Sequence, residues 1–206
     1  MKSRGILPWY AVSTTHTWRI NDEKNGASDS IADCRGGCGD KITEPDASLA
    51  KVKAQFHPMN EIAKANSAGY TVWSPDPSVA GSTCPSSADG NMGYHLVNVQ
   101  LRGAASSPAA GDAVIDKMNP EMLLYEKSAT GTLTLAGVEY IVFKDAWERV
   151  NGANAAPPEV FGQPLLASSH TFVTGGASIP HYELHVWLCK TNPRGEFFPY
   201  NPAVTC

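Results

Sequence analysis

The sequence predicts an α+β fold, in which one N-terminal helical segment packs on a curved, mostly antiparallel β-sheet or flattened barrel. Two observations predict it. Apolar residues recur at helical spacing in one early stretch, 47–62. The later chain instead shows segments with β-rich composition or two-residue alternation. No regular helical pattern separates these segments, which disfavours a doubly wound parallel sheet.

We expect one globular domain over residues 47–206, preceded by an irregular N-terminal arm over residues 1–46. A chain of 206 residues is long enough for one domain with a substantial core. The arm is polar and turn-rich, and its Cys34 and Cys38 lie among glycines that allow a small disulfide loop. A metal pair is the competing interpretation of these cysteines, but no second pair with matching spacing completes a zinc site.

The helical segment has recognisable ends. Asp46 is a fair N-cap, and Gly69 is a C-terminal stop. Pro58 lies within the pattern and should kink the helix or split it in two, because proline cannot donate a backbone hydrogen bond. The apolar positions at helical spacing are Leu49, Val52, Phe56, Met59 and Ile62.

Strands dominate after a long turn-rich loop at 74–91. The expected strands are 92–101, 122–127, 132–144 and 181–190. The segment EKSATG predicts a hairpin turn between the second and third strands, DAWERV predicts one helical turn, and NGANAAPPEVFGQP predicts a proline-rich excursion over the surface.

Three of these strands carry a polar side chain on an apolar face. Side chains in a strand alternate between faces, so residues of equal parity share a face. By this rule His95, Glu139 and Glu126 point inward from separate strands. The apolar residues of matching parity are Val97, Val99 and Leu101 for His95; Leu133, Leu135, Ile141 and Phe143 for Glu139; and Met122 and Leu124 for Glu126. A buried carboxylate needs a proton, a salt bridge or a metal as compensation.

The last strand can supply that compensation. In HYELHVWLC, His181, Glu183 and His185 alternate on one face. The two histidines lie roughly 13–14 Å apart along an extended strand, so one of them, and not both, is expected to bind a given ion directly.

The candidate metal ligands are therefore His95, Glu139 and His185, with His181 in the outer shell and Glu126 as a further ligand or catalytic general base. This mixed nitrogen and oxygen set suits one divalent transition metal, Zn, Fe, Mn or Cu. Open positions on such an ion would suit oxygen chemistry or metal-assisted hydrolysis. The alternative without a metal is that the histidine is hydrogen-bonded in the core and that the glutamate pairs with an arginine such as Arg102 or Arg149.

A second class of function is a non-catalytic module that binds a small molecule or saccharide. Its pocket would be lined by Trp187, Phe197 and Tyr200, and its inward polar residues would only hydrogen-bond one another or a ligand. A structural or interaction protein with a polar core network is a third class. The two histidines in polar loops, His16 and His170, are expected to be exposed.

Composition excludes other partners. The net charge of −4 and the absence of a basic stripe disfavour nucleic acid. No apolar run is long enough to span a bilayer, and none near the N-terminus is typical of a signal peptide, so the chain is expected to be a mature or trimmed form. Five cysteines favour an oxidising, secreted or periplasmic location; Cys84 and Cys206 can form a bridge that leaves Cys189 as a thiol, although several pairings stay open.

An ordered set of motifs runs over roughly residues 48–206. Its segments are Ala68-Gly69-Tyr70; Met92-Gly93-x-His95-x-Val97-Asn98; Pro120-Glu121-x-Leu123-Leu124-Tyr125-Glu126; Gly137-Val138-Glu139-Tyr140; Pro180-His181-Tyr182-x-Leu184-His185-Val186-Trp187-Leu188; Asn192-Pro193-x-Gly195-x-Phe197; and Asn201-Pro202-x-Val204-x-Cys206. This set resembles a family of uncharacterised secreted or lipid-anchored bacterial proteins. The resemblance implies a secreted location and a single domain, and it implies no activity. It does not extend to the first forty residues.

Overall fold

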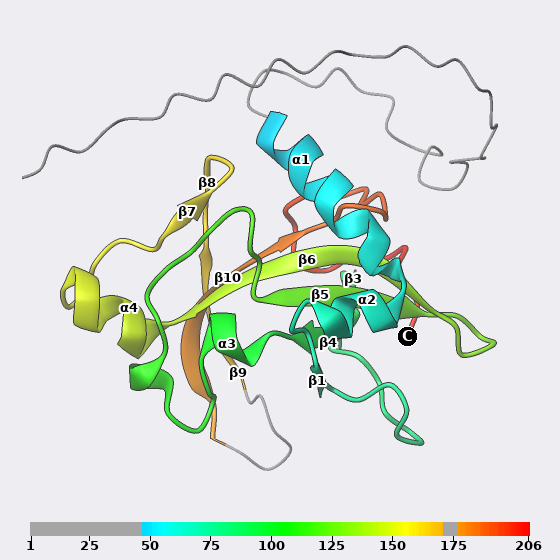
Figure 1. Ribbon diagram of the computed structural model, residues 1–206, viewed down its shortest axis with the longest axis horizontal. Helices are drawn as coiled ribbons and strands as arrows, with labels where there is room; N and C mark the ends of the chain where they lie inside the picture. The colour runs from blue at the N-terminus through cyan, green and yellow to red at the C-terminus, as the bar shows by residue number, and fades with distance from the viewer. Residues whose placement is uncertain (1–46, 171–176) are drawn as a thin grey trace, which may run out of the picture. The chain divides into compact units, whose positions relative to one another are not determined.

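The computed structural model describes residues 47–170 and 177–206 and confirms the α+β class. Its centre is a curled, six-stranded antiparallel sheet with the strand order β1–β4–β5–β6–β10–β9 (Figure 1). The strands are β1 (Val72–Ser74), β4 (Tyr94–Val97), β5 (Met122–Lys127), β6 (Leu133–Phe143), β9 (Leu166–His170) and β10 (Ile179–Val186). The expected arm at 1–46, with Cys34, Cys38, the cap residue Asp46 and His16, lies outside the described residues.

The early helical segment is split at its proline, as predicted. Helix α1 (Ala47–Phe56) ends where the short 3₁₀ helix η2 (His57–Asn60) begins, and α2 (Ile62–Ser67) follows. Pro58 lies in the first turn of η2, where its missing amide hydrogen costs nothing. Gly69 follows α2 with a φ of 93°, the left-handed conformation expected of a glycine that ends a helix.

The two faces of the sheet are covered differently. One face and helix α1 bury the larger hydrophobic cluster, which includes Leu49, Val52, Phe56, Leu123, Tyr125, Val138, Tyr140, Leu184 and Val186. The opposite face carries two smaller clusters. They consist of Val97, Met122, Ile141, Phe143 and Ala146, and of Leu124, Ala136, Trp187 and Val204. The inward polar residues lie on this second face, which we call the polar face.

A β-bulge on β6 changes which residues share that face. Leu124 of β5 pairs with Gly137, but the next residue, Tyr125, pairs with Leu135, so Ala136 is an extra residue on β6. The expectation that Leu133 and Leu135 share a face with Glu139 is therefore wrong, because the inserted residue shifts the alternation by one. Both leucines belong to the larger cluster on the opposite face, whereas Ile141 and Phe143 lie beside Glu139 as expected.

Several element boundaries also differ from expectation. The strand expected at 92–101 ends at Val97, because the Asn98 side chain accepts hydrogen bonds from Gln100 N and Leu101 N and begins the short helix α3 (Val99–Arg102). The single turn expected after Phe143 is the longer helix α4 (Lys144–Asn151). Further short elements lie in segments for which no helix or strand was predicted: β1, β9, η3 (Pro108–Ala110), and two hairpins formed by β2 (Ser86–Ser87) with β3 (Gly90–Asn91) and by β7 (Glu159–Val160) with β8 (Gln163–Pro164).

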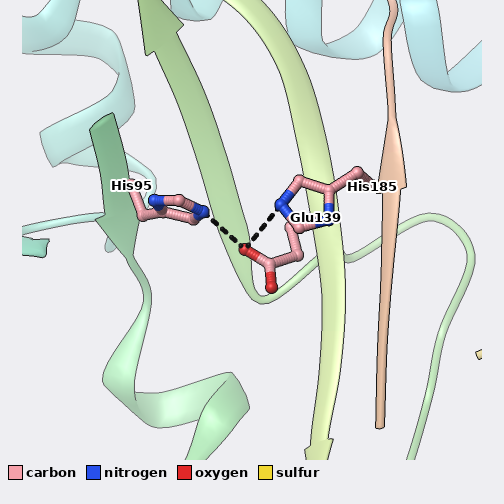
Figure 2. A group of neighbouring side chains, drawn as sticks. All are labelled: His95, Glu139 and His185. Atoms are coloured by element: carbon pink, nitrogen blue, oxygen red, sulfur yellow. Dashed lines mark ion pairs between the residues drawn. The ribbon is translucent and has the colours of Figure 1, made fainter. Parts of the chain in front are cut away.

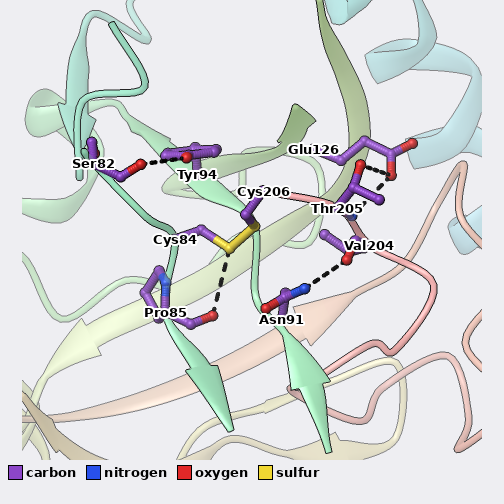
Figure 3. Close-up of a disulfide and its surroundings, with 9 residues drawn as sticks. All are labelled: Ser82, Cys84, Pro85, Asn91, Tyr94, Glu126, Val204, Thr205 and Cys206. Carbon is purple, nitrogen blue, oxygen red and sulfur yellow. Dashed lines mark hydrogen bonds between the residues drawn. A yellow bond between two sulfur atoms is a disulfide. The ribbon is translucent and has the colours of Figure 1, made fainter. Parts of the chain in front are cut away.

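The C-terminal segment is fastened to the sheet. A disulfide joins Cys84 to Cys206, and the Asn91 side-chain amide donates to Val204 O at 2.7 Å (Figure 3). Val204 packs on Trp187 in the smaller of the two polar-face clusters. Among the described residues Cys189 is not disulfide-bonded, and no described helix has the length and apolar character needed to cross a membrane.

Candidate metal centre

Three strands bring His95, Glu139 and His185 together on the polar face (Figure 2). Glu139 of β6 lies directly opposite His185 of β10 in the strand register. His95 comes from β4, on the far side of β5, so its imidazole reaches over β5 to meet the carboxylate. His95 Nε2 lies 3.2 Å from Glu139 Oε2, and His185 Nε2 lies 3.9 Å from the same oxygen.

These three side chains are almost fully buried. The exposed fractions of the side chains are 9% for His95, 2% for Glu139 and 1% for His185, so His95 is the least buried of the three. Glu139 Oε2 and both ring nitrogens of His185 make no hydrogen bond within the described part of the chain. The contact from His95 has ion-pair distance without hydrogen-bond geometry. Each buried polar atom without a hydrogen bond lowers the stability of the folded state by about 1–3 kcal/mol.

Burial and the attraction between the carboxylate and the imidazoles act in opposite directions on the pKa values of this group. Burial disfavours the charged form of Glu139, but the attraction of His185 and His95 in their protonated forms outweighs burial and lowers the pKa of Glu139. Burial also lowers the pKa of His185, with the two glutamates opposing it. A carboxylate and a neutral imidazole are the forms in which these side chains bind metals.

The neighbours of the group hold its side chains in place. The ring of Trp187 stacks on that of His185 with an interplanar angle of 27°, and the Trp187 Nε1 donates to Phe198 O at 2.7 Å. The buried guanidinium of Arg102 lies over the Phe143 ring, 5.7 Å from its centroid, and its charge interacts with Glu139. Arg102 is one of the two arginines that the sequence offered as a glutamate partner.

A second group of ligand-type side chains lies on the same face. It consists of His170 on β9 with His181 and Glu183 on β10. Glu183 Oε2 lies 2.9 Å from His181 Nε2 and 3.5 Å from His170 Nε2. Burial disfavours the charged form of Glu183, but the hydrogen bonds from His170 and His181 outweigh it and hold its pKa well below the ordinary range.

The structure therefore separates the two histidines of the H-x-E-x-H run. His185 lies with His95 and Glu139, whereas His181 lies with Glu183. His170, expected to be an exposed loop residue, lies on strand β9 and keeps 45% of its side chain exposed. The sequence did not predict the contact of His170 with Glu183, because the polar segment LASSH gives no clear strand signal. The alternation of β10 places Glu183 on its face but does not show which residue of a neighbouring strand lies beside it.

Glu126 lies apart from both groups. Its carboxylate pairs with Lys190 at 2.8 Å and accepts a hydrogen bond from Thr205 N at 3.3 Å. It shares the polar face with Leu124, but it is two residues beyond Leu124 on β5, away from Glu139. Its contacts fasten the C-terminal segment to β5.

The three aromatic residues considered for a pocket do not form one cluster. Trp187 is buried against Leu124 and Val204 on the polar face. Phe197 packs against the larger cluster and stacks on Phe161 with an interplanar angle of 27°. Tyr200 is half-buried, and its carbonyl oxygen accepts a hydrogen bond from the Asn192 side chain.

No family model, curated protein or solved structure matches this chain. The chemistry of the site is therefore argued from its own atoms. Ligand atoms at about 2.0–2.2 Å from a zinc-like ion, at tetrahedral angles, lie roughly 3.3–3.5 Å from one another. The 3.2 Å and 3.9 Å separations at Glu139 Oε2 lie close to this span. These buried side chains could hold a metal ion.

Proposed function

We propose that this protein binds one divalent transition-metal ion through His95, Glu139 and His185. One observation supports this most directly. Buried atoms of Glu139 and His185 converge with His95 without the hydrogen bonds that buried polar atoms normally make. A metal ion would compensate the carboxylate and one ring nitrogen of each histidine at once, because it accepts the lone pairs of two imidazoles and neutralises the carboxylate.

The donor set points to the class of metal and of chemistry. Two imidazole nitrogens and one carboxylate suit Zn, Fe, Mn or Cu better than Ca or Mg, which prefer oxygen ligands. Three protein ligands leave at least one coordination position for water or a substrate, as in catalytic rather than closed structural zinc sites. We propose on this basis that the ion supports hydrolysis or oxygen chemistry, with access past His95. Small-molecule substrates fit this access best, because the site is otherwise closed.

We also propose a secreted or periplasmic location. The Cys84–Cys206 disulfide supports an oxidising compartment. The motif resemblance to secreted or lipid-anchored bacterial proteins points the same way and belongs to the same proposal.

The test is metal content, measured by inductively coupled plasma mass spectrometry on protein purified without a polyhistidine tag. We expect one tightly held equivalent in the parent, its loss in His95→Ala, and its retention in His57→Ala. His57 is the matched control because it is an exposed histidine on η2, outside both groups. Circular dichroism would show that each variant is folded. A parent that stays metal-free after reconstitution, or a His95→Ala variant that keeps the tightly held ion, would contradict the proposal.

A further inference from the structure

We infer that the polar face carries a second metal site, formed by His170, His181 and Glu183, that is open to solvent and separate from the buried one. This inference depends only on these three residues and stands whether or not the buried site binds an ion. The chemistry it predicts is a divalent transition-metal ion held by two imidazoles and one carboxylate.

The hydrogen bonding of His181 directs its Nε2 at the Glu183 carboxylate, where a proton or a metal ion fits between the two atoms. His181 Nδ1 lies 2.7 Å from Ile179 O, and because a carbonyl oxygen can only accept, Nδ1 carries the proton. In a neutral ring the other nitrogen, Nε2, then presents a lone pair to Glu183 Oε2, 2.9 Å away. Two lone pairs at this distance repel each other unless a proton or a metal ion lies between them.

The same arrangement is the usual one for a metal-binding histidine. Such a residue typically donates its other ring N–H to a backbone carbonyl or carboxylate, which fixes the ring and directs the free nitrogen at the ion. Ile179 O has this role for His181. The second imidazole is already in place, since the His170 ring meets that of His181 edge-on with centroids 4.4 Å apart.

The ligand distances agree with a shared ion. Glu183 Oε2 lies 2.9 Å from His181 Nε2 and 3.5 Å from His170 Nε2, and ligand atoms of one tetrahedral ion lie roughly 3.3–3.5 Å apart. The His170 side chain is 45% exposed, so an ion can enter and leave from solvent. We therefore expect faster exchange and weaker binding here than among the buried ligands.

The two groups are inferred to hold separate ions. They share no ligand, and the Cα atoms of Glu183 and His185 are roughly 6.5–7 Å apart along β10. Bridged two-metal centres place their ions about 3.5–4 Å apart. The face therefore offers two independent mononuclear sites, and each can be removed without the other.

The test is the stoichiometry of Zn²⁺ bound by the tag-free full-length chain, measured by equilibrium dialysis against buffered Zn²⁺. The parent is expected to bind a second, weaker equivalent, which His170→Ala and Glu183→Gln lose. His170→Ala should fold normally because 45% of its side chain is exposed, and His57→Ala serves again as the matched control. In ¹⁵N spectra of the histidine rings, the Nε2 signals of His170 and His181 should shift on Zn²⁺ addition.

The outcomes separate this inference from the proposed function. Zn²⁺ binding that is lost in His170→Ala but kept in His95→Ala supports the second site alone. A parent that binds only the His95-dependent equivalent, or a His170→Ala variant that keeps both equivalents, overturns the second site. Unchanged Nε2 signals of His170 and His181 at saturating Zn²⁺ also overturn it.

Discussion

At the residue scale, the polar face concentrates ionisable side chains that a folded protein normally keeps near water. Glu139, Glu183 and His185 are buried. On the same face, Glu139 lies within ion-pair distance of His185, and Glu183 lies within ion-pair distance of His181. Glu183 Oε2 lies within hydrogen-bond distance of His181 Nε2, whereas Glu139 Oε2 makes no hydrogen bond within the described residues. The burial of the Glu139 carboxylate is therefore less compensated than that of Glu183, and a bound ion would stabilise Glu139 more.

Removal of the proposed ion should therefore destabilise the parent. A ligand at a hundred times its dissociation constant stabilises the folded state by about 2.7 kcal/mol. A strong chelator should lower the melting temperature of the parent by more than that of His95→Ala, as followed by circular dichroism. Equal melting temperatures of the parent with and without chelator would argue against a bound ion.

Glu121 should make stability depend on pH. Its carboxylate is buried, with Oε2 accepting from Ile141 N at 2.9 Å, and burial raises its pKa well above the ordinary value. Between the ordinary pKa and the raised one, the folded chain keeps a proton that the unfolded chain has released. The contribution of Glu121 to stability is therefore complete below the ordinary glutamate pKa and declines as the pH rises through this window.

Glu121→Gln should remove that decline, since the amide oxygen can still accept from Ile141 N and cannot ionise. We expect the variant to be more stable than the parent at neutral pH and of similar stability at acidic pH. Urea denaturation across the pH range measures the difference. Parallel pH profiles of the two proteins would show that Glu121 is not the responsible group.

At the element scale, the close pairing of β6 with β10 places Glu139 opposite His185. Gly137 of β6 makes this approach possible, because a Cβ atom there would overlap the carbonyl oxygen of Val186. Backbone atoms in a sheet cannot move aside as a flexible side chain can. The glycine therefore supports the register beside the buried group.

Gly137→Ala should accordingly destabilise the fold by about 1–3 kcal/mol, the usual cost of overpacking, and should weaken metal binding at the buried group. Gly131→Ala is the comparison variant, since its φ of 85° imposes backbone strain but an added Cβ would meet nothing within 4 Å. That variant should be destabilised without loss of metal affinity. Titration calorimetry and urea denaturation measure the two effects, and unchanged affinity in Gly137→Ala would refute the role of this glycine.

Sequence patterns predicted these elements where alternation or helical spacing is strong. The split helix at Pro58 and strand β5 follow from local chemistry alone. The alternation rule placed His95, Glu139 and His185 on one face. The rule assigned Leu133 and Leu135 to the wrong face, because the extra residue Ala136 shifts the alternation of β6 and leaves no signal in the local sequence. Strand β9, and with it the contact of His170, was missed because its pairing depends on β10 rather than on its own composition.

At the scale of the whole molecule, the disulfide joins segments that are distant in the chain. Cys84 and Cys206 are separated by 122 residues, and a closed loop of this size restricts the unfolded chain strongly. The bridge also holds the C-terminal segment, with Val204, over Trp187. Loss of the bridge should thus destabilise the chain and loosen the support behind His185.

The double variant Cys84→Ser, Cys206→Ser should be less stable than the parent by about 2–5 kcal/mol. Chemical denaturation under oxidising conditions measures this difference. The parent in the presence of a reductant should show the same loss, which separates the missing bond from effects of the serines. Equal stability of the variant and the parent would mean that the bridge contributes nothing in solution.

The placement of the buried ligands on β4, β6 and β10 also sets an order of events in time. These strands are distant in the chain, and their contacts form late in folding because long loops must close first. An ion that needs all three side chains is therefore expected to bind after these strands have paired. Metal loading at this group is thus expected to follow completion of the sheet.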